Sequence, residues 1–232
     1  MIPPNTSHVL LAGIVGSTAY GLAGPGSDID TLGIFAAPTR DLVGLRTPDE
    51  THVSTKPDRT LHEAKKWCLL ALNGNPAVLE ITWLPDDLYQ VRTPLGEQLI
   101  AIRSAFLAAP RVRDAYLGYA AGQFKRLSGR FGPNVEHATR KRAAKEARHL
   151  ARLITQGCEL YATGTLTVRL DSPDLIRDFG DRVAAGDLDE AKSLLDVAET
   201  FFDNTRSPLP ARPNEGPVRE WLSAVRTTHW EA

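Results

Sequence analysis

The sequence has few cysteines, no long apolar run and almost no net charge. Its 232 residues include two cysteines, Cys68 and Cys158, which lie outside any CxxC pattern or histidine spacing typical of a metal site. We interpret them as buried thiols of a cytoplasmic protein rather than as part of a disulfide or zinc framework. The longest apolar stretch, residues 8–15, has the length of a strand. Neither a membrane span nor a signal peptide is therefore expected.

The formal net charge of −1 is the sum of three unequal segments. Residues 1–110 carry −3, residues 111–152 carry +8 from 11 basic and 3 acidic residues, and residues 153–232 carry −6. A basic run is most often a solvated helix face, and the alternative is a local site for an anionic partner. Indiscriminate adhesion to nucleic acid is not expected, so a polynucleotide partner would be met locally, along residues 111–152.

The hydrophobic pattern changes along the chain from strand-like to helical. Apolar runs at 8–15 and 29–36 predict two strands, and a weaker pattern at 51–58 predicts a third. Apolar spacing predicts a helix over 60–74 and a short helix or turn over 75–85. The remainder is predicted to be helical, in segments 95–107, 111–129, 134–163, 173–185, 187–204 and 216–227. We therefore predict an α+β chain, with a mixed-sheet domain at residues 1–93 and an all-helical domain at 94–232.

Two closely spaced carboxylates, Asp28 and Asp30, carry the clearest chemical signal. Side chains two apart in a strand project to the same side, about 6.6 Å apart, where their charges repel and resist burial. A divalent cation would neutralise them, and Mg²⁺ prefers such oxygen ligands together with phosphate. Asp58, at the end of the third predicted strand, is placed to supply a third carboxylate. Gly16 and Ser17, after the first strand, offer backbone N–H groups and a hydroxyl to a phosphate.

The segment GSTAYGLAGPGSDIDTLGIF, residues 16–35, resembles the signature of nucleotidyltransferases of the DNA polymerase β superfamily. The closest resemblance is to the RlaP-type predicted nucleotidyltransferases, named for an association with RNA ligases. Residues 62–85 resemble the family's basic-aromatic helix followed by G-N-P-x-x-L-E, and residues 145–168 its H-L-x-R-L helix and L-x-T-G-x-L turn. The resemblance implies a polymerase β-like α/β core and an enzyme that moves a nucleotidyl group from an NTP to an acceptor, with Mg²⁺ or Mn²⁺ bound and pyrophosphate released. It leaves the acceptor open among RNA, DNA, protein and a small molecule.

The same resemblance implies roles for single residues. Asp28 and Asp30 would hold the metals, and Asp58 would complete the site while positioning or deprotonating the acceptor hydroxyl. Glu80 is the competing acid, with a structural role as its alternative. The candidate nucleotide-binding residues are Gly16, Ser17, Tyr20, Ser27, Glu80, Lys141, Lys145, His149 and Arg152.

A basic stripe supplies several of these candidates. On one helix, four side chains fall along one face, namely Lys141, Lys145, His149 and Arg152. A cationic stripe facing the carboxylates would bind the triphosphate and offset charge on the leaving pyrophosphate; the alternative is a solvated face. The remaining cations are candidates for contact with an acceptor backbone, namely Arg111, Arg113, Lys125, Arg126, Arg130 and Arg140.

Two other classes of function are considered. One is a non-catalytic nucleotide-binding or regulatory module, against which the presence of Asp28, Asp30 and Asp58 argues, because degenerate members usually lose one such acid. The other is a toxin–antitoxin nucleotidyltransferase that modifies a protein or a tRNA. Its minimal members are much shorter than 232 residues and lack a large helical extension, so the length argues against it.

Overall fold

The computed structural model describes residues 8–45, 48–130 and 137–230. The chain divides into two compact units, a first unit of Met1–Leu107 with Pro213–Ala232 and a second unit of Ala108–Arg212. Each unit is described by itself. This division falls later than the predicted boundary after residue 93, because the helix that starts at Pro94 packs on the first unit and the last helix returns to it. In the described residues, no helix has both the length and the apolar character needed to cross a membrane.

The first unit is built on a five-stranded mixed sheet with the order β3-β4-β2-β1-β5. Its strands are β1 (Val9–Val15), β2 (Asp30–Phe35), β3 (Thr51–Thr55), β4 (Asp58–Glu63) and β5 (Tyr89–Arg92). β2 and β4 run parallel, and the other neighbours run antiparallel. Together with the helical second unit, this sheet confirms the predicted α+β class with a mixed sheet.

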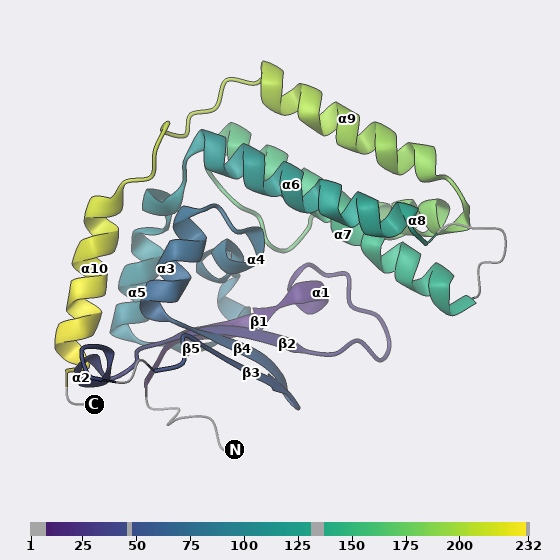
Figure 1. Ribbon diagram of the computed structural model, residues 1–232. Coiled ribbons are helices and arrows are strands. Elements are labelled where there is room, and N and C mark those ends of the chain that lie inside the picture. The colour runs from purple at the N-terminus through teal and green to yellow at the C-terminus, as the bar shows by residue number, and fades with distance from the viewer. Residues whose placement is uncertain (1–7, 46–47, 131–136, 231–232) are drawn as a thin grey trace. The chain divides into compact units, whose positions relative to one another are not determined.

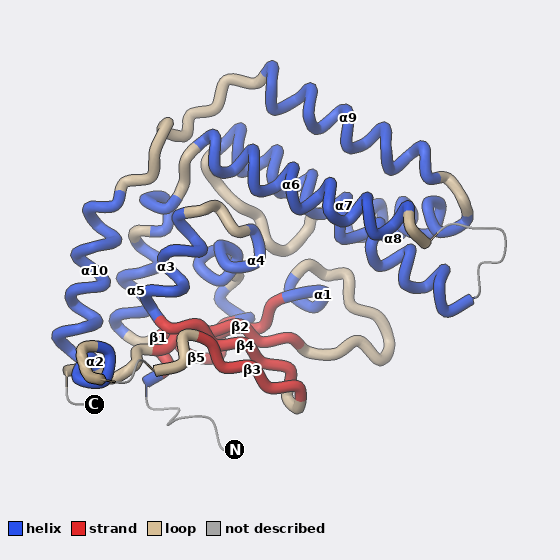
Figure 2. The backbone as a smooth tube through the Cα atoms, viewed as in Figure 1, coloured by secondary structure: helices blue, strands red, loops and turns tan. Residues whose placement is uncertain are grey.

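Helices cover one side of this sheet. Figures 1 and 2 show α3 (Ala64–Leu72), α4 (Pro76–Leu79), α5 (Pro94–Ala101) and α10 (Glu215–Thr228) on the same side. The short elements of the unit are α1 (Gly16–Ala19), α2 (Thr39–Leu42), η2 (Glu80–Trp83), η3 (Asp86–Leu88) and η4 (Arg103–Phe106). The core between the layers is apolar and fully buried, and the rings of Trp67 and Phe106 meet edge to face at 5.1 Å within it.

Side-chain caps explain where several helices start. Glu63 accepts a hydrogen bond from the Lys65 N–H at 2.8 Å at the start of α3. Asn75 does the same for α4, where Pro76 occupies the first turn. Thr93 caps α5, and its hydroxyl accepts from the Gly96 N–H at 3.2 Å. These residues satisfy N–H groups that have no partner inside the helix.

Two strands differ from the sequence prediction. The helix predicted over 60–74 begins only at Ala64, because residues 58–63 form β4 and pair with β2 along its length. β5, a four-residue strand at the sheet edge, was not predicted. In addition, β2 begins at Asp30, so Asp28 lies in the preceding loop and not in the strand where the spacing predicted it.

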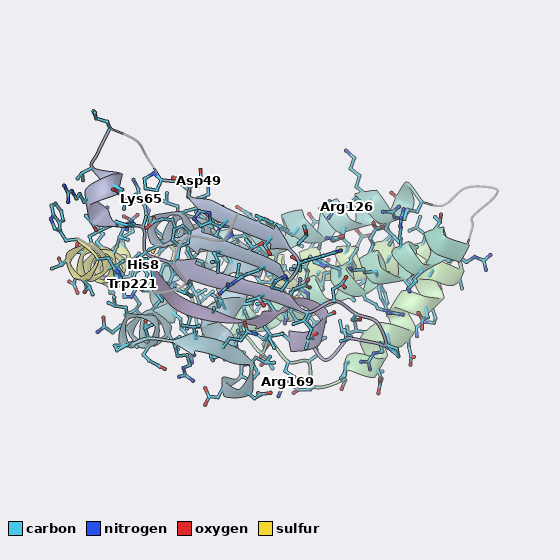
Figure 3. The ribbon with its side chains drawn as sticks, turned by 90° about the horizontal axis from the view of Figure 1, so that it is seen from below. His8, Asp49, Lys65, Arg126, Arg169 and Trp221 are labelled. Atoms are coloured by element: carbon cyan, nitrogen blue, oxygen red, sulfur yellow. The ribbon has the colours of Figure 1, made fainter. Side chains whose placement is uncertain are left out.

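The C-terminal helix α10 is tied to the rest of the first unit by polar contacts from its middle and from its C-terminal end. Arg226 donates to both carboxylate oxygens of Glu63, at 2.6 and 3.0 Å. The indole N–H of Trp221, labelled in Figure 3, donates to the Leu95 carbonyl at 2.8 Å. Thr39 also donates to the Arg226 carbonyl at 2.8 Å. The last helical segment therefore completes the sheet unit, although the sequence grouped it with the helical domain.

In its described residues, the second unit contains four helices. They are α6 (Ala109–Ser128), α7 (His137–Thr163), α8 (Pro173–Ala185) and α9 (Leu188–Asn204), and α7 contacts each of the other three. At Gly157 an added Cβ would lie 2.7 Å from the Tyr116 side chain, so glycine lets α6 and α7 approach closely. Asp187 accepts from the Glu190 N–H at 3.1 Å and starts α9, as its spacing to Glu190 predicted.

The two cysteines are free. Cys68 is buried and Cys158 is partly buried. Burial raises the pKa of Cys68 to about 12 and that of Cys158 to about 11. Both thiols are therefore protonated and unreactive at neutral pH, in agreement with their predicted packing role.

Candidate active site

The end of β1 and the start of β2 bring the two halves of the sequence motif together. Val15, the last residue of β1, pairs with Asp30, the first residue of β2. The chain then turns at Gly16, which has a φ of +68° and opens the single turn α1. A residue with a Cβ rarely adopts this left-handed conformation, which explains the glycine.

Gly16 is also required by its close approach to Asp30. A Cβ built on Gly16 would lie 2.3 Å from Asp30 Oδ2 and 3.2 Å from its Cγ. The Asp30 carboxylate therefore occupies the space that any other residue at position 16 would fill. Two residues that the sequence linked only by motif are in direct contact in the fold.

Asp58 lies at the same end of the sheet as Asp30. β2 and β4 are parallel, with Thr31 paired to Arg59, so Asp30 and Asp58 precede this pair on neighbouring strands. Asp58 is the first residue of β4, rather than the last residue of the third strand as predicted. Asp30 is partly buried, whereas Asp58 and Asp28 are exposed.

Binding of a magnesium ion by these carboxylates stays a prediction, with which their chemistry as oxygen donors is compatible. Among the residues that the structure describes, no three His, Cys, Asp or Glu side chains form a group able to hold a metal by themselves. Mg²⁺ does not need such a cage, because it keeps several waters and is commonly bound by one or two carboxylates plus substrate phosphates. Asp30, placed against the backbone of Gly16, is an oxygen donor of that kind, and Asp28 is an exposed carboxylate in the loop just before it.

The loop between α1 and β2 is shaped by its own hydrogen bonds. Ser27 accepts from the Gly24 N–H through its side-chain oxygen at 3.0 Å. The carbonyl of Ser17 accepts from the N–H groups of Leu22 and Ala23 at 2.8 and 3.0 Å. These bonds close the turn that follows α1. They use the carbonyl of Ser17, and its hydroxyl takes no part in them.

Tyr20 and Glu80 form a buried hydrogen-bonded pair. The Tyr20 hydroxyl donates to Glu80 Oε2 at 2.6 Å, and the two residues are 7% and 3% exposed. This contact joins the turn after α1 to η2. Glu80 is therefore a buried, hydrogen-bonded carboxylate and not a surface one. Contact of either side chain with a nucleotide stays a prediction.

The predicted basic stripe runs along α7 of the second unit from an exposed end to a buried one. Lys141 and Lys145 are exposed, His149 is partly buried and Arg152 is 2% exposed. Arg152 donates to Gln156 Oε1 at 2.7 Å, and its Nη2 lies 3.2 Å from His149 Nε2.

His149 does not contribute a positive charge to this stripe. Burial first, and then the charges of Arg152, Arg126 and Lys145, lower the pKa of His149 to about 3. The imidazole is neutral at pH 7, with Nε2 placed to accept from Arg152. The cationic character that the sequence predicted therefore belongs to the lysines and the arginine. The role of the stripe toward a nucleotide stays a prediction.

Sequence reasoning missed Gln156 of α7 and the proximity of Arg126 to His149. Gln156 anchors Arg152 and donates to the Thr167 and Val168 carbonyls at 3.0 and 3.1 Å. It lies four residues after Arg152, so extending the same helical spacing would have found it. Arg126 of α6 influences the His149 pKa, and no spacing along the chain indicates that proximity.

Comparison with known proteins identifies a family for the chain. Residues 3–200 match the model of the RlaP family, described as the RNA repair pathway DNA polymerase beta family. No curated protein matches the chain. The match covers most of the sequence, including the Gly16–Asp30 motif, the three segments that carry the resemblance and most of the second unit. The chain therefore belongs to the RlaP family, the RNA repair pathway DNA polymerase beta family.

Proposed function

We propose that this chain is a metal-dependent nucleotidyltransferase that moves an NMP from an NTP to an acceptor and releases pyrophosphate. Membership of a polymerase β-like nucleotidyltransferase family supports the reaction class. The observation that carries the proposal is the contact between Gly16 and Asp30, where a Cβ would lie 2.3 Å from the carboxylate. This contact supports the proposal because it sets a carboxylate beside the backbone of a glycine turn, and nucleotidyl transfer needs metal-binding carboxylates close to phosphate-binding groups.

The carboxylates have two proposed roles, one toward the nucleotide and its metal ion and one toward the acceptor. Asp28 and Asp30 are the residues that would hold Mg²⁺ or Mn²⁺, and a bound divalent ion neutralises phosphate charge and polarises the phosphoryl oxygens. Asp58, on the neighbouring parallel strand, is exposed and free to orient an acceptor hydroxyl and to take its proton. Gly16 and Ser17 supply backbone N–H groups and a hydroxyl to the phosphates.

From the sequence we also propose that three cations of α7, Lys141, Lys145 and Arg152, contact the triphosphate. Arg152 is held in place by Gln156, which is itself bonded to two carbonyls, so the guanidinium is fixed before any ligand arrives. Lys141 and Lys145 lie exposed further along the same helix and supply flexible positive charge. Together they would offset the charge that develops on the leaving pyrophosphate.

The test is the substitution Asp30→Asn, which keeps the shape of the side chain and removes its charge. Transfer from α-labelled NTPs to a mixed pool of RNA ends, DNA ends and proteins is measured with Mg²⁺ or Mn²⁺, together with pyrophosphate release. We expect Asp30→Asn to abolish both signals while the circular dichroism spectrum stays unchanged. Asp49→Asn is the control, because Asp49 is an exposed aspartate of the same unit. Full transfer by Asp30→Asn would refute the proposed function.

A further inference from the structure

Six cations lie at the adjoining ends of α6 and α7, and none of them has an acidic partner among the residues that the structure describes. They are Lys125, Arg126, Arg140, Lys141, Arg142 and Lys145, here called the α6–α7 basic patch. All six are exposed, and within the described part of the chain none of them takes part in an ion pair.

Most other basic side chains of this unit are paired with acids. Arg113 bonds to Asp203, Arg148 to Asp181 and Arg182 to Glu190. Arg177 and Lys192 each pair with an aspartate on their own helix. The second unit therefore has acids available for pairing, and the six patch cations are left without them. A face meant only for solubility would carry mixed charges.

The two helices converge at this patch. Arg130, just past the end of α6, donates to both carboxylate oxygens of Glu146 on α7, at 2.6 and 2.5 Å. This bidentate contact holds the end of α6 against α7. It also pairs Glu146, the acid next to Lys145 in the sequence, with Arg130. Arg126, labelled in Figure 3, is one turn before that contact and acts electrostatically on His149 of α7. Arg126 of α6 and Lys145 of α7 both act on His149, so the patch draws on both helices.

The length of the patch suits a chain of phosphates. On α7 the patch runs from Arg140 to Lys145, five residues apart, which corresponds to about 8 Å at 1.5 Å per residue. A stacked strand places one phosphate about every 3.4 Å, so this distance spans roughly two phosphate spacings.

The patch also lacks apolar anchors. The exposed large hydrophobic side chains of the described residues include none between Lys125 and Arg152. A helix that binds a membrane surface inserts apolar side chains, and a protein interface is centred on aromatic or aliphatic anchors. Contacts with a phosphate backbone need only exposed Lys and Arg.

We propose that the α6–α7 basic patch binds the phosphate backbone of a single-stranded nucleic acid, which is the acceptor strand of the reaction. The identification of that strand as the acceptor rests on the proposed function. Binding of the strand by the patch does not rest on the proposed function, because it depends on neither the carboxylates nor a nucleotide.

The test measures binding of a fluorescein-labelled single-stranded RNA 20-mer to the whole chain by anisotropy, with EDTA, without NTP, and at several salt concentrations. The test variant is Lys125→Gln with Arg142→Gln, one cation from each helix and neither of them a predicted nucleotide contact. Each lost phosphate contact lowers the salt slope by about 0.7, so we expect the slope to fall by about 1.4. The affinity at 50 mM salt should fall by at least about 10-fold. The control is Arg177→Gln with Lys192→Gln, which removes the same charge from paired positions and should leave both values unchanged.

Three results would overturn the proposal: no salt-dependent strand binding, equal loss in the control variant, or equal binding of a polyglutamate peptide or of phosphatidylserine vesicles. A DNA strand of the same sequence forms a second arm, and binding of either strand supports the proposal. Asp30→Asn should bind the RNA as the unchanged chain does. If Asp30→Asn loses transfer but still binds the RNA, strand binding and catalysis are independent of each other. Either proposal can then fail without the other.

Discussion

The substitution Gly16→Ala tests the contact on which the candidate active site depends. Gly16 has a φ of +68°, so an alanine there adopts a left-handed conformation at a cost of about 1–2 kcal/mol. Its Cβ would also lie 2.3 Å from Asp30 Oδ2, whereas ordinary contact begins at 3.4 Å. The carboxylate therefore has to move by about 1 Å. A displacement of that size at reacting groups costs on the order of 100-fold in rate.

A matched control separates strain from displacement. Gly164, in the second unit, has a φ of +74°, and a Cβ there would meet only Leu209 at an ordinary 3.4 Å. Gly164→Ala therefore carries the same backbone strain without moving a candidate catalytic group. We expect both variants to lose about 1–2 kcal/mol of unfolding free energy, and only Gly16→Ala to lose transfer activity by about 100-fold.

Two measurements decide the outcome. Urea denaturation gives the free energy of unfolding of each variant, and pyrophosphate release with Mg²⁺ and NTP gives the rate. If Gly16→Ala retains as much activity as Gly164→Ala, the Asp30 carboxylate either is not catalytic or does not depend on its position against Gly16, and the reasoning fails.

Two further predictions concern buried polar pairs of the first unit. Arg226→Ala leaves Glu63, whose side chain is 4% exposed, as a buried charge without its guanidinium. We expect a loss of about 3–5 kcal/mol in urea denaturation, against less than about 1 kcal/mol for Arg219→Ala, whose ion pair is exposed. Equal losses would show that the Glu63 pair is no more important than a surface one. Tyr20→Phe removes the hydroxyl that donates to Glu80 at 2.6 Å in a buried site. The expected loss is about 1–3 kcal/mol of unfolding free energy by the same assay, and an unchanged stability would contradict the buried pairing.

Local patterns were sufficient for the helices of the second unit. Apolar residues at helical spacing and a cap at Asp187 predicted α8 and α9 within a few residues of their observed bounds. These helices form from contacts and hydrogen bonds close along the chain, so their pattern is visible in the sequence alone.

Local patterns failed where strands pair. Leu61 fits the helical spacing of residues 60–74, yet residues 58–63 form β4 because β2 lies beside them and satisfies their backbone groups. The position of α10 is a second case, since its helix was predicted but its return to the sheet unit through Arg226 and Glu63 was not. Partners that are far apart in the chain leave no periodic signal.

The sequence by itself determined the family, the α+β class and the residues of the motif, because these follow from residue type and spacing along the chain. Only the tertiary structure decided that Asp30 lies against Gly16, that Asp30 and Asp58 begin neighbouring parallel strands, and which cations are left without acids. The physical reason is the same in each case. Spacing measures distance along the backbone, whereas contacts and ion pairs depend on which segments the fold places side by side.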